Sequence, residues 1–331
     1  MRTTTRRTVG ALLATALAVG LSACSSGDEP DGVENAGAAD NGSAFPVTVE
    51  HEFGQTTITS APERVVSIGW GDLDRILALD VIPVGYYSGF ADGELPPWSA
   101  ELVGDAEPID LGDTTELDFE EIAALDPDLI IAVNGTGVDE ESFQILDAIA
   151  PTVARPAGTG GWSVPLAEGT RQVSTALGTP EAGETLLDDL QRKQESVREA
   201  NPELQGKRGA AVITYDGSSY YVFRPQDGRG AFLESIGLVL PEQVNAPELG
   251  TKLSLELSPE QVDILDGDVV LFMADDPDYD PVADNPLFER FDATLLPVAG
   301  LDREAISLGT PASLSYALDS LVPRIAEAVQ N

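Results

Sequence analysis

Short apolar runs alternate with amphipathic segments from about residue 64 of this 331-residue chain to its end. The run at 128–133 (DLIIAV) is almost continuously apolar, as expected of a strand buried on both faces of a sheet. The segments between such runs carry apolar residues at helical spacing, which indicates helices. In this half, strands are predicted at 64–68, 81–86, 128–133 and 152–154, and helices at 72–79 and 143–149. This order predicts an α/β lobe built on a parallel or mixed sheet.

A β-hairpin is predicted before these elements, and the second half of the chain repeats the alternation of strands and helices. Residues 45–59 alternate apolar and polar positions around Gly54, which predicts a short β-hairpin. In the second half, strands are predicted at 209–214, 219–223 and 268–273, a helix at 230–236, and a closing amphipathic helix at 313–329. A second α/β lobe is therefore expected.

A long helix is predicted between the two halves. Thr179 is a capping residue, and Pro180 suits the first helical position. The helix runs to about Ala200 and places Ala182, Leu186, Leu190 and Val197 on one stripe. At 1.5 Å per residue it is roughly 30 Å long, so it predicts a stiff connector between the lobes.

Two segments 140 residues apart share one pattern. Residues 118–131 (DFEEIAALDPDLII) and 258–271 (SPEQVDILDGDVVL) each contain a capping box, a helix, a tight turn and a buried strand. The boxes pair Asp118 with Glu121, and Ser258 with Gln261. Any helix-to-strand junction could converge on part of this pattern. The match of cap, glutamate and turn together favours two related lobes.

The amino terminus has the features of an export signal. Three arginines precede the apolar residues 9–20, a stretch too short to span a bilayer, so 1–23 is predicted to be a signal peptide. Residues 21–24 (LSAC) resemble the lipobox of bacterial lipoproteins. That resemblance implies lipid modification of Cys24 and an anchor on the extracytoplasmic face of the cell membrane. A plain signal peptide is the alternative, and the sequence does not separate Sec from twin-arginine export.

Composition excludes several classes of protein. The chain has 18 basic and 57 acidic residues and a net charge of −39, and loss of residues 1–23 makes it −42. Such a surface repels nucleic acid. Cys24 is the only cysteine, so neither a disulfide nor a cysteine-based zinc site can form within the chain. Residues 24–45 are acidic and nearly free of large apolar side chains, which predicts a disordered tether.

Motifs for catalysis and for metal binding are missing from the sequence. It contains no P-loop, no GxSxG, no SxxK and no GxGxxG after a predicted strand, so neither an enzyme nor a bound cofactor is expected. His51, the only histidine, lies in the predicted hairpin, whereas a zinc or manganese site needs several ligands. No metal-binding residues are therefore predicted.

Four motifs together resemble one family. Residues 45–54 (FPVTVEHEFG), 61–66 (APERVV), 125–131 (LDPDLII) and 285–288 (NPLF) are similar to the iron–siderophore solute-binding proteins of ABC importers, as is the final helix. The resemblance implies two parallel or mixed α/β lobes joined by one long rigid helix, the class III arrangement of periplasmic binding proteins. The expected parts are the signal peptide 1–23, the tether 24–45, lobes at 46–178 and 206–331, and the connector 179–205.

The resemblance also implies partners. A monomeric, lipid-anchored protein would bind a ferric siderophore and dock on ABC permease subunits through one surface glutamate per lobe. The matching positions are Glu120 and Glu260, and an acid at a helix start is stabilised by the helix dipole. Both could instead be ordinary helix-start residues. Cobalamin or haem as ligand, and a surface sensor or adhesin without transport, remain alternative functions.

Ligand contacts are expected beyond the carboxyl ends of the strands, where α/β sheets bind ligands. The candidates are Trp70, Tyr86, Tyr87, Asn134, Arg155, Trp162, Tyr215, Arg224 and Arg229. Aromatic faces can lie against a bulky chelate, and guanidinium groups can pair with anionic oxygens around ferric iron. Each could equally serve packing or the surface. The sequence does not identify the siderophore, and the mixture of aromatics with few cations slightly favours hydroxamate or mixed ligands.

Overall fold

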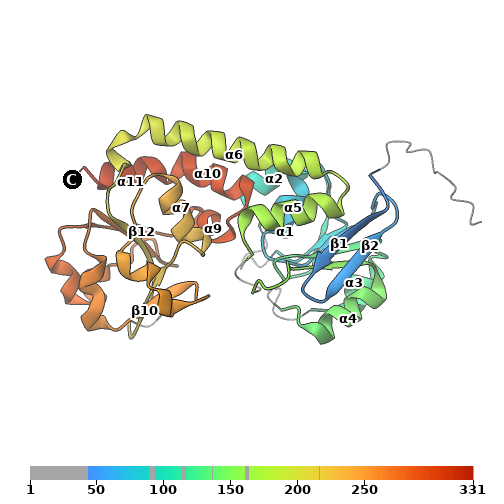
Figure 1. Ribbon diagram of the computed structural model, residues 1–331, viewed down its shortest axis with the longest axis horizontal. Helices are drawn as coiled ribbons and strands as arrows, with labels where there is room; N and C mark the ends of the chain where they lie inside the picture. The colour runs from blue at the N-terminus through green and yellow to red at the C-terminus, as the bar shows by residue number, and fades with distance from the viewer. Residues whose placement is uncertain are drawn as a thin grey trace, which may run out of the picture. The chain divides into compact units, whose positions relative to one another are not determined.

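The computed structural model describes residues 44–88, 94–112, 117–135, 137–160, 164–215 and 217–330 (Figure 1). The predicted signal peptide, Cys24, nearly all of the predicted tether and the candidate Trp162 lie outside these residues. Within them, no helix combines the length and the apolar character needed to cross a membrane. Residues 43–331 form one compact unit.

The first lobe is built on a parallel sheet of five strands. Their order is β5-β4-β3-β6-β7, and all neighbours run parallel. The strands are β3 (Val65–Ser67), β4 (Gly85–Tyr86), β5 (Ile109–Asp110), β6 (Leu129–Ala132) and β7 (Thr152–Ala154). The helices are α1 (Asp72–Leu77), α2 (Pro97–Val103), α3 (Phe119–Ala124), α4 (Glu140–Ile149) and α5 (Leu166–Ala176).

Both faces of this sheet are buried because apolar residues fill consecutive positions of its central strands. Successive side chains of a strand point to opposite faces. Leu129 and Ile131 accordingly join one core cluster, and Ile130 joins another on the opposite face. The predicted hairpin is confirmed as β1 (Val47–His51) paired antiparallel with β2 (Gly54–Ile58).

The second lobe has a mixed sheet of five strands in the order β10-β9-β8-β11-β12. The strands are β8 (Gly209–Ile213), β9 (Tyr220–Phe223), β10 (Ser254–Leu257), β11 (Val269–Met273) and β12 (Thr294–Val298). Strands β8, β11 and β12 are parallel, whereas β9 runs antiparallel to both β8 and β10. The helices are α7 (Gly228–Ser235), α8 (Pro281–Asp284), α9 (Gly300–Leu308), α10 (Pro311–Ser320) and α11 (Val322–Ala328). Short 3₁₀ segments are Pro202–Leu204, Glu242–Asn245, Pro247–Leu249, Pro259–Leu265 and Pro286–Arg290.

The connector is α6 (Pro180–Ala200), which packs against α5 of the first lobe and α10 of the second (Figure 1). Its approach to α5 is close, because a Cβ added at Gly183 would lie 2.2 Å from Ser174 Oγ. The predicted fold class is thus confirmed: two α/β lobes, one parallel and one mixed, are joined by one long helix.

Three local predictions need correction. The closing helix is divided into α10 and α11 at Leu321, since Pro323 has no N–H to donate and crowds the preceding turn. The hydroxyl of Thr179 donates to the Ser174 carbonyl (3.5 Å) and does not cap α6. Ala182, expected on the apolar stripe of α6, is exposed, and Gly183 is buried in its place.

The repeated segments have matching hydrogen bonds in the two lobes. Asp128 accepts the Arg64 N–H (2.9 Å), and Asp268, 140 positions later, accepts the Arg208 N–H (2.7 Å). Each acid therefore ties the buried strand to the residue that precedes the first sheet strand of its lobe. The helices differ, because Asp118 caps an α-helix whereas the segment Pro259–Leu265 is a 3₁₀ helix. The shared bonds support two related lobes.

Candidate functional site

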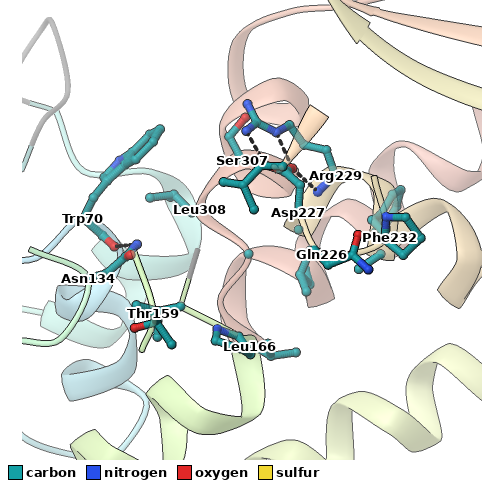
Figure 2. Close-up of a pocket in the computed structure, with 18 of the residues that line it drawn as sticks. Trp70, Asn134, Thr159, Leu166, Gln226, Asp227, Arg229, Phe232, Ser307 and Leu308 are labelled. Carbon is teal, nitrogen blue, oxygen red and sulfur yellow. Dashed lines mark hydrogen bonds and ion pairs between the residues drawn. The ribbon is translucent and has the colours of Figure 1, made fainter. Parts of the chain in front are cut away.

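A cavity of about 510 Å³ lies between the lobes, under α6. Its lining comes from loops after strands of the first lobe, from the start of α7, from the turn between α9 and α10, and from Gln194 of α6. Figure 2 shows Trp70 and Asn134 on one side, facing Asp227, Arg229 and Phe232 on the other.

The first-lobe wall is built at the carboxyl ends of β3, β6 and β7, as expected for a parallel sheet. Trp70 follows β3 and Asn134 follows β6. The two loops are joined by hydrogen bonds from Asn134 Nδ2 to the Trp70 carbonyl (2.7 Å) and from Trp70 N to the Asn134 carbonyl (3.2 Å). Gly69 permits this approach, since a Cβ there would lie 2.7 Å from Asn134 N. These hydrogen bonds fix the loops after β3 and β6 relative to each other.

Charged residues of α1 lie behind that wall. Arg75 lines the cavity and pairs through Nη1 with Asp72 Oδ1 at 3.3 Å, and both side chains are almost fully buried. Asp72 Oδ2 also accepts the Asn134 N–H (3.0 Å), which connects the ion pair to the wall. Burial raises the pKa of Asp72, and the neighbouring Arg75 opposes that rise. Burial likewise lowers the pKa of Arg75.

Asp74 joins the two lobes. Its buried carboxylate accepts hydrogen bonds from Trp98 Nε1 (3.0 Å) and Ser99 Oγ (2.5 Å) of α2. A third bond comes from Thr310 Oγ1 (2.8 Å) at the start of α10. Burial raises the pKa of Asp74, although these three donors pull it down. The carboxylate is thus a shared acceptor for elements on both sides of the cavity.

The second-lobe wall contains a bidentate ion pair at the start of α7. Asp227 Oδ1 caps the helix by accepting the Arg229 N–H (2.9 Å). The same carboxylate binds Arg229 Nε and Nη2, both at 2.7 Å (Figure 2). The guanidinium carbon of Arg229 lies 3.6 Å from the centroid of the Phe223 ring. Arg229 is therefore fixed by a carboxylate and by an aromatic face.

The structure brings three of the predicted ligand contacts together in this cavity: Trp70, Asn134 and Arg229. Tyr86 is buried in a small apolar cluster of the first lobe. Tyr87 is also buried, and its hydroxyl oxygen accepts the Asp118 N–H (2.9 Å). Neither tyrosine lines the cavity.

Two arginines that were predicted to contact the ligand instead donate hydrogen bonds to backbone carbonyls. Arg155 donates to the carbonyls of Thr159 (3.0 Å) and Val138 (3.1 Å). Arg224 is buried and donates to the carbonyls of Val244 (2.6 Å), Gly250 (3.0 Å) and Lys252. It thereby holds the loop 244–252, whose residues 250 and 251 line the cavity, as does the next residue, Leu253.

Tyr215 lies in a different place. It borders a second cavity of about 380 Å³ at the carboxyl ends of β8 and β11, where Arg303 pairs with Asp275 (2.5 Å). The residue is 80% exposed, and its ring centroid lies 5.9 Å from that of Tyr221. Because β9 runs antiparallel to β8, a residue after β8 and a residue after β9 lie at opposite ends of that strand pair. Tyr215 and Arg229 therefore do not share one cavity.

Glu120 and Glu260 are both exposed at the starts of their helices. Within the described part of the chain, no group of three or more His, Cys, Asp or Glu side chains is arranged to hold a metal ion.

The sequence reasoning missed Asp72, Asp74, Arg75 and Asp227. The first three (DLDR at 72–75) face inward on a short helix, although such charges are usual on a solvent face. The sequence did carry a signal for Asp227, which stands two residues before Arg229 at the start of a predicted helix. An acid at such a position can cap the helix and also pair with the cation that follows it.

Comparisons with known proteins agree with this architecture. The model of the periplasmic binding protein family matches residues 65–294. The petrobactin-binding protein YclQ of Bacillus subtilis is 26% identical over 215 residues, which cover 63% of this chain and 65% of that protein, slightly under two thirds of its length.

Two solved structures are similar over nearly their full lengths. The periplasmic solute binding protein from Mycobacterium smegmatis is 28% identical, covers 88% of this chain and 100% of that one, and superposes with a TM-score of 0.75. PiaA of Streptococcus pneumoniae in complex with ferrichrome is 26% identical, covers 86% of this chain and 99% of that one, and has a TM-score of 0.72.

Proposed function

This chain belongs to the periplasmic binding protein family, and we propose that it captures a ferric siderophore outside the cell and delivers it to an ABC permease. The observation that carries the proposal is the cavity between the lobes, with an aromatic side chain and amide and hydroxyl groups on its walls. The names of similar proteins support the ligand class, since YclQ binds petrobactin and PiaA was solved with ferrichrome.

The cavity suits a compact organic chelate. Its volume of about 510 Å³ lies within the usual range for small-molecule sites, about 300–1,000 Å³. Trp70, Leu166 and Leu308 offer apolar surface, while Asn134 and Gln226 offer amide groups. A siderophore presents mainly organic surface around its iron, so apolar contacts with a few polar groups can hold it.

The test is a titration of tryptophan fluorescence in the purified full chain. The panel contains ferric hydroxamate, catecholate and citrate chelates, their iron-free forms, haemin, cobalamin, Zn²⁺ and Ca²⁺, with inner-filter controls. Saturable quenching by a ferric chelate at micromolar concentration or tighter, about −8 kcal/mol or better, supports the proposal. The Trp70→Phe variant should be quenched less than the wild type, because Trp70 lines the cavity whereas Trp98 is buried in α2. A response to haemin, cobalamin or a bare ion alone overturns the siderophore.

We further propose that Glu120 and Glu260 dock on the permease. Both are exposed helix-start acids at equivalent positions of the two repeated segments. The double change Glu120→Arg and Glu260→Arg should abolish uptake and leave affinity for the chelate unchanged. The matched control, Glu195→Arg with Glu199→Arg on exposed positions of α6, makes the same change of charge and should transport normally. Normal uptake by the first variant would refute the docking role of these two residues.

We also propose that Cys24 carries the lipid anchor, that residues 24–45 form the tether, and that the lobes and connector have the boundaries 46–178, 179–205 and 206–331. Metabolic labelling with a fatty acid should mark the wild type and leave Cys24→Ser unlabelled. Equal labelling of both would place the anchor elsewhere.

A further inference from the structure

The ionic groups that line the cavity are already paired. Arg75, Asp227 and Arg229 are the lining side chains that carry charge, and Arg229 forms two bonds of 2.7 Å with the Asp227 carboxylate. A bidentate pair of this kind satisfies both the charge and the geometry of a guanidinium. Arg229 therefore contributes donors to the wall and no net positive charge.

On the other side of the cavity, the charge of Arg75 is likewise matched by a carboxylate. Arg75 pairs with Asp72, and Asp74 adds a second buried carboxyl beside it. Two acids thus accompany one cation, so this region carries no excess positive charge. Both arginines that line the cavity are therefore paired with a carboxylate, and the lining presents no unpaired positive charge.

The remaining basic residues of the described chain do not line the cavity. The internal segments outside the described residues contain no lysine or arginine, so every basic residue after residue 43 has a described position. Arg155 and Arg224 bind backbone carbonyls. Lys252 follows the lining residue Thr251 but does not line the cavity, and its side chain is exposed to solvent that screens its charge.

Resting on the siderophore function proposed above, we propose that the cavity selects an uncharged ferric chelate, and that Asp227 sets this selectivity by neutralising Arg229. A hydroxamate loses one proton on binding iron, so three hydroxamates balance Fe³⁺ and give a neutral complex. Three catecholates lose six protons and leave a trianion. The predicted ligand is therefore a ferric trihydroxamate.

Desolvation explains the selectivity. A trianion that enters the cavity gives up hydration, and a buried charge without a counter-charge is costly. The chain adds to this cost through its net charge of −39, which repels an approaching anion. A neutral complex avoids both costs and can use the apolar wall and the amide groups.

The test compares two hexadentate chelates built on one tripodal scaffold, a neutral ferric trihydroxamate and a ferric tricatecholate of charge −3. Equilibrium dialysis with radioactive iron gives both dissociation constants for the full chain. The wild type should bind the trihydroxamate at least about tenfold more tightly. Asp227→Asn retains a capping oxygen for α7 and frees Arg229, so it should tighten the tricatecholate by about tenfold, or about 1.4 kcal/mol, relative to the trihydroxamate measured on the same variant.

Two further variants separate the causes. Asp263→Asn frees Arg290 from a pair that lies outside the cavity and changes the net charge equally, so it should alter neither constant. Arg229→Gln removes the cation and should give no gain for the tricatecholate. The gain in Asp227→Asn should also fall as salt concentration rises, since it is a charge interaction.

The outcomes distinguish the two proposals. Equal or tighter binding of the tricatecholate by the wild type, or no gain in a folded Asp227→Asn variant, would overturn the selectivity inference and leave the siderophore function standing. Binding of neither chelate, together with binding of haemin or cobalamin, would overturn the proposed function itself.

Discussion

The hydroxyl of Thr310 offers a direct measure of how strongly the lobes are joined. Thr310 is completely buried at the start of α10. Its Oγ1 donates to Asp74 Oδ2 (2.8 Å) and accepts the Ser313 N–H (3.1 Å). The change Thr310→Val keeps the shape of the side chain and removes both bonds.

The expected cost follows from these two bonds. Loss of a helix cap costs about 1 kcal/mol. Loss of a buried hydrogen bond to a carboxylate costs about 1.5–3 kcal/mol. The variant should therefore lose about 2.5–4 kcal/mol of unfolding free energy. For a domain of this size the loss corresponds to a fall in Tm of roughly 5–12 °C.

The measurement is urea and thermal unfolding followed by circular dichroism. Thr310→Ser is the control, because it keeps the hydroxyl and removes only a methyl group, at a cost of about 1 kcal/mol. If the valine and serine variants lose the same stability within about 0.5 kcal/mol, the hydroxyl bonds contribute nothing, and the join between the lobes must rest on apolar packing.

Three further predictions concern packing, pH and the loop behind the cavity. Gly183→Ala should destabilise the protein by about 1–3 kcal/mol in urea unfolding, despite the higher helix propensity of alanine, because the new Cβ meets Ser174; Ser174→Gly in the same chain should restore most of the loss. Burial raises the pKa of Asp72 and Asp74 in the folded protein, so their contribution to stability is greatest below their ordinary pKa of about 4 and is lost as the pH rises through the raised values. Unfolding free energies measured from about pH 4 upward should therefore decline less steeply in Asp74→Asn than in the wild type, and equal slopes would contradict the raised pKa. Arg224→Leu should cost at least about 3 kcal/mol and admit proteolysis at 244–252, since three carbonyls lose their donor; an unchanged digestion pattern would show that other contacts hold the loop.

Periodicity predicted most of the fold because the central strands are buried on both faces. Runs such as 128–133 and 268–273 have no polar interruption, and both became central strands. The antiparallel direction of β9 was missed, although the sequence carried a signal for it. Only six residues separate Ile213 from Tyr220, and parallel strands need a crossover of a dozen or more. Recognition of β8 and β9 as a hairpin would have predicted that Tyr215 and Arg229 lie at opposite ends of this strand pair.

The site was harder to predict because its chemistry depends on distant partners. Trp70 and Asn134 were found, since the carboxyl ends of parallel strands meet at one edge. The buried charges of α1 were not, because the donors to Asp74 come from α2 and from Thr310. Arg155 and Arg224 are indistinguishable in sequence from ligand-binding arginines, and only their backbone partners show their structural role.

The bond between Asp74 and Thr310 also bears on the order of synthesis. The two residues are 236 positions apart, so the carboxylate is made long before its partner on α10. Before α10 is in place, the Asp74 carboxylate has donors only from α2, Trp98 Nε1 and Ser99 Oγ, and lacks the Thr310 hydroxyl. The first lobe therefore completes its polar core only after α10 has docked on it, so the two lobes do not finish folding independently of each other.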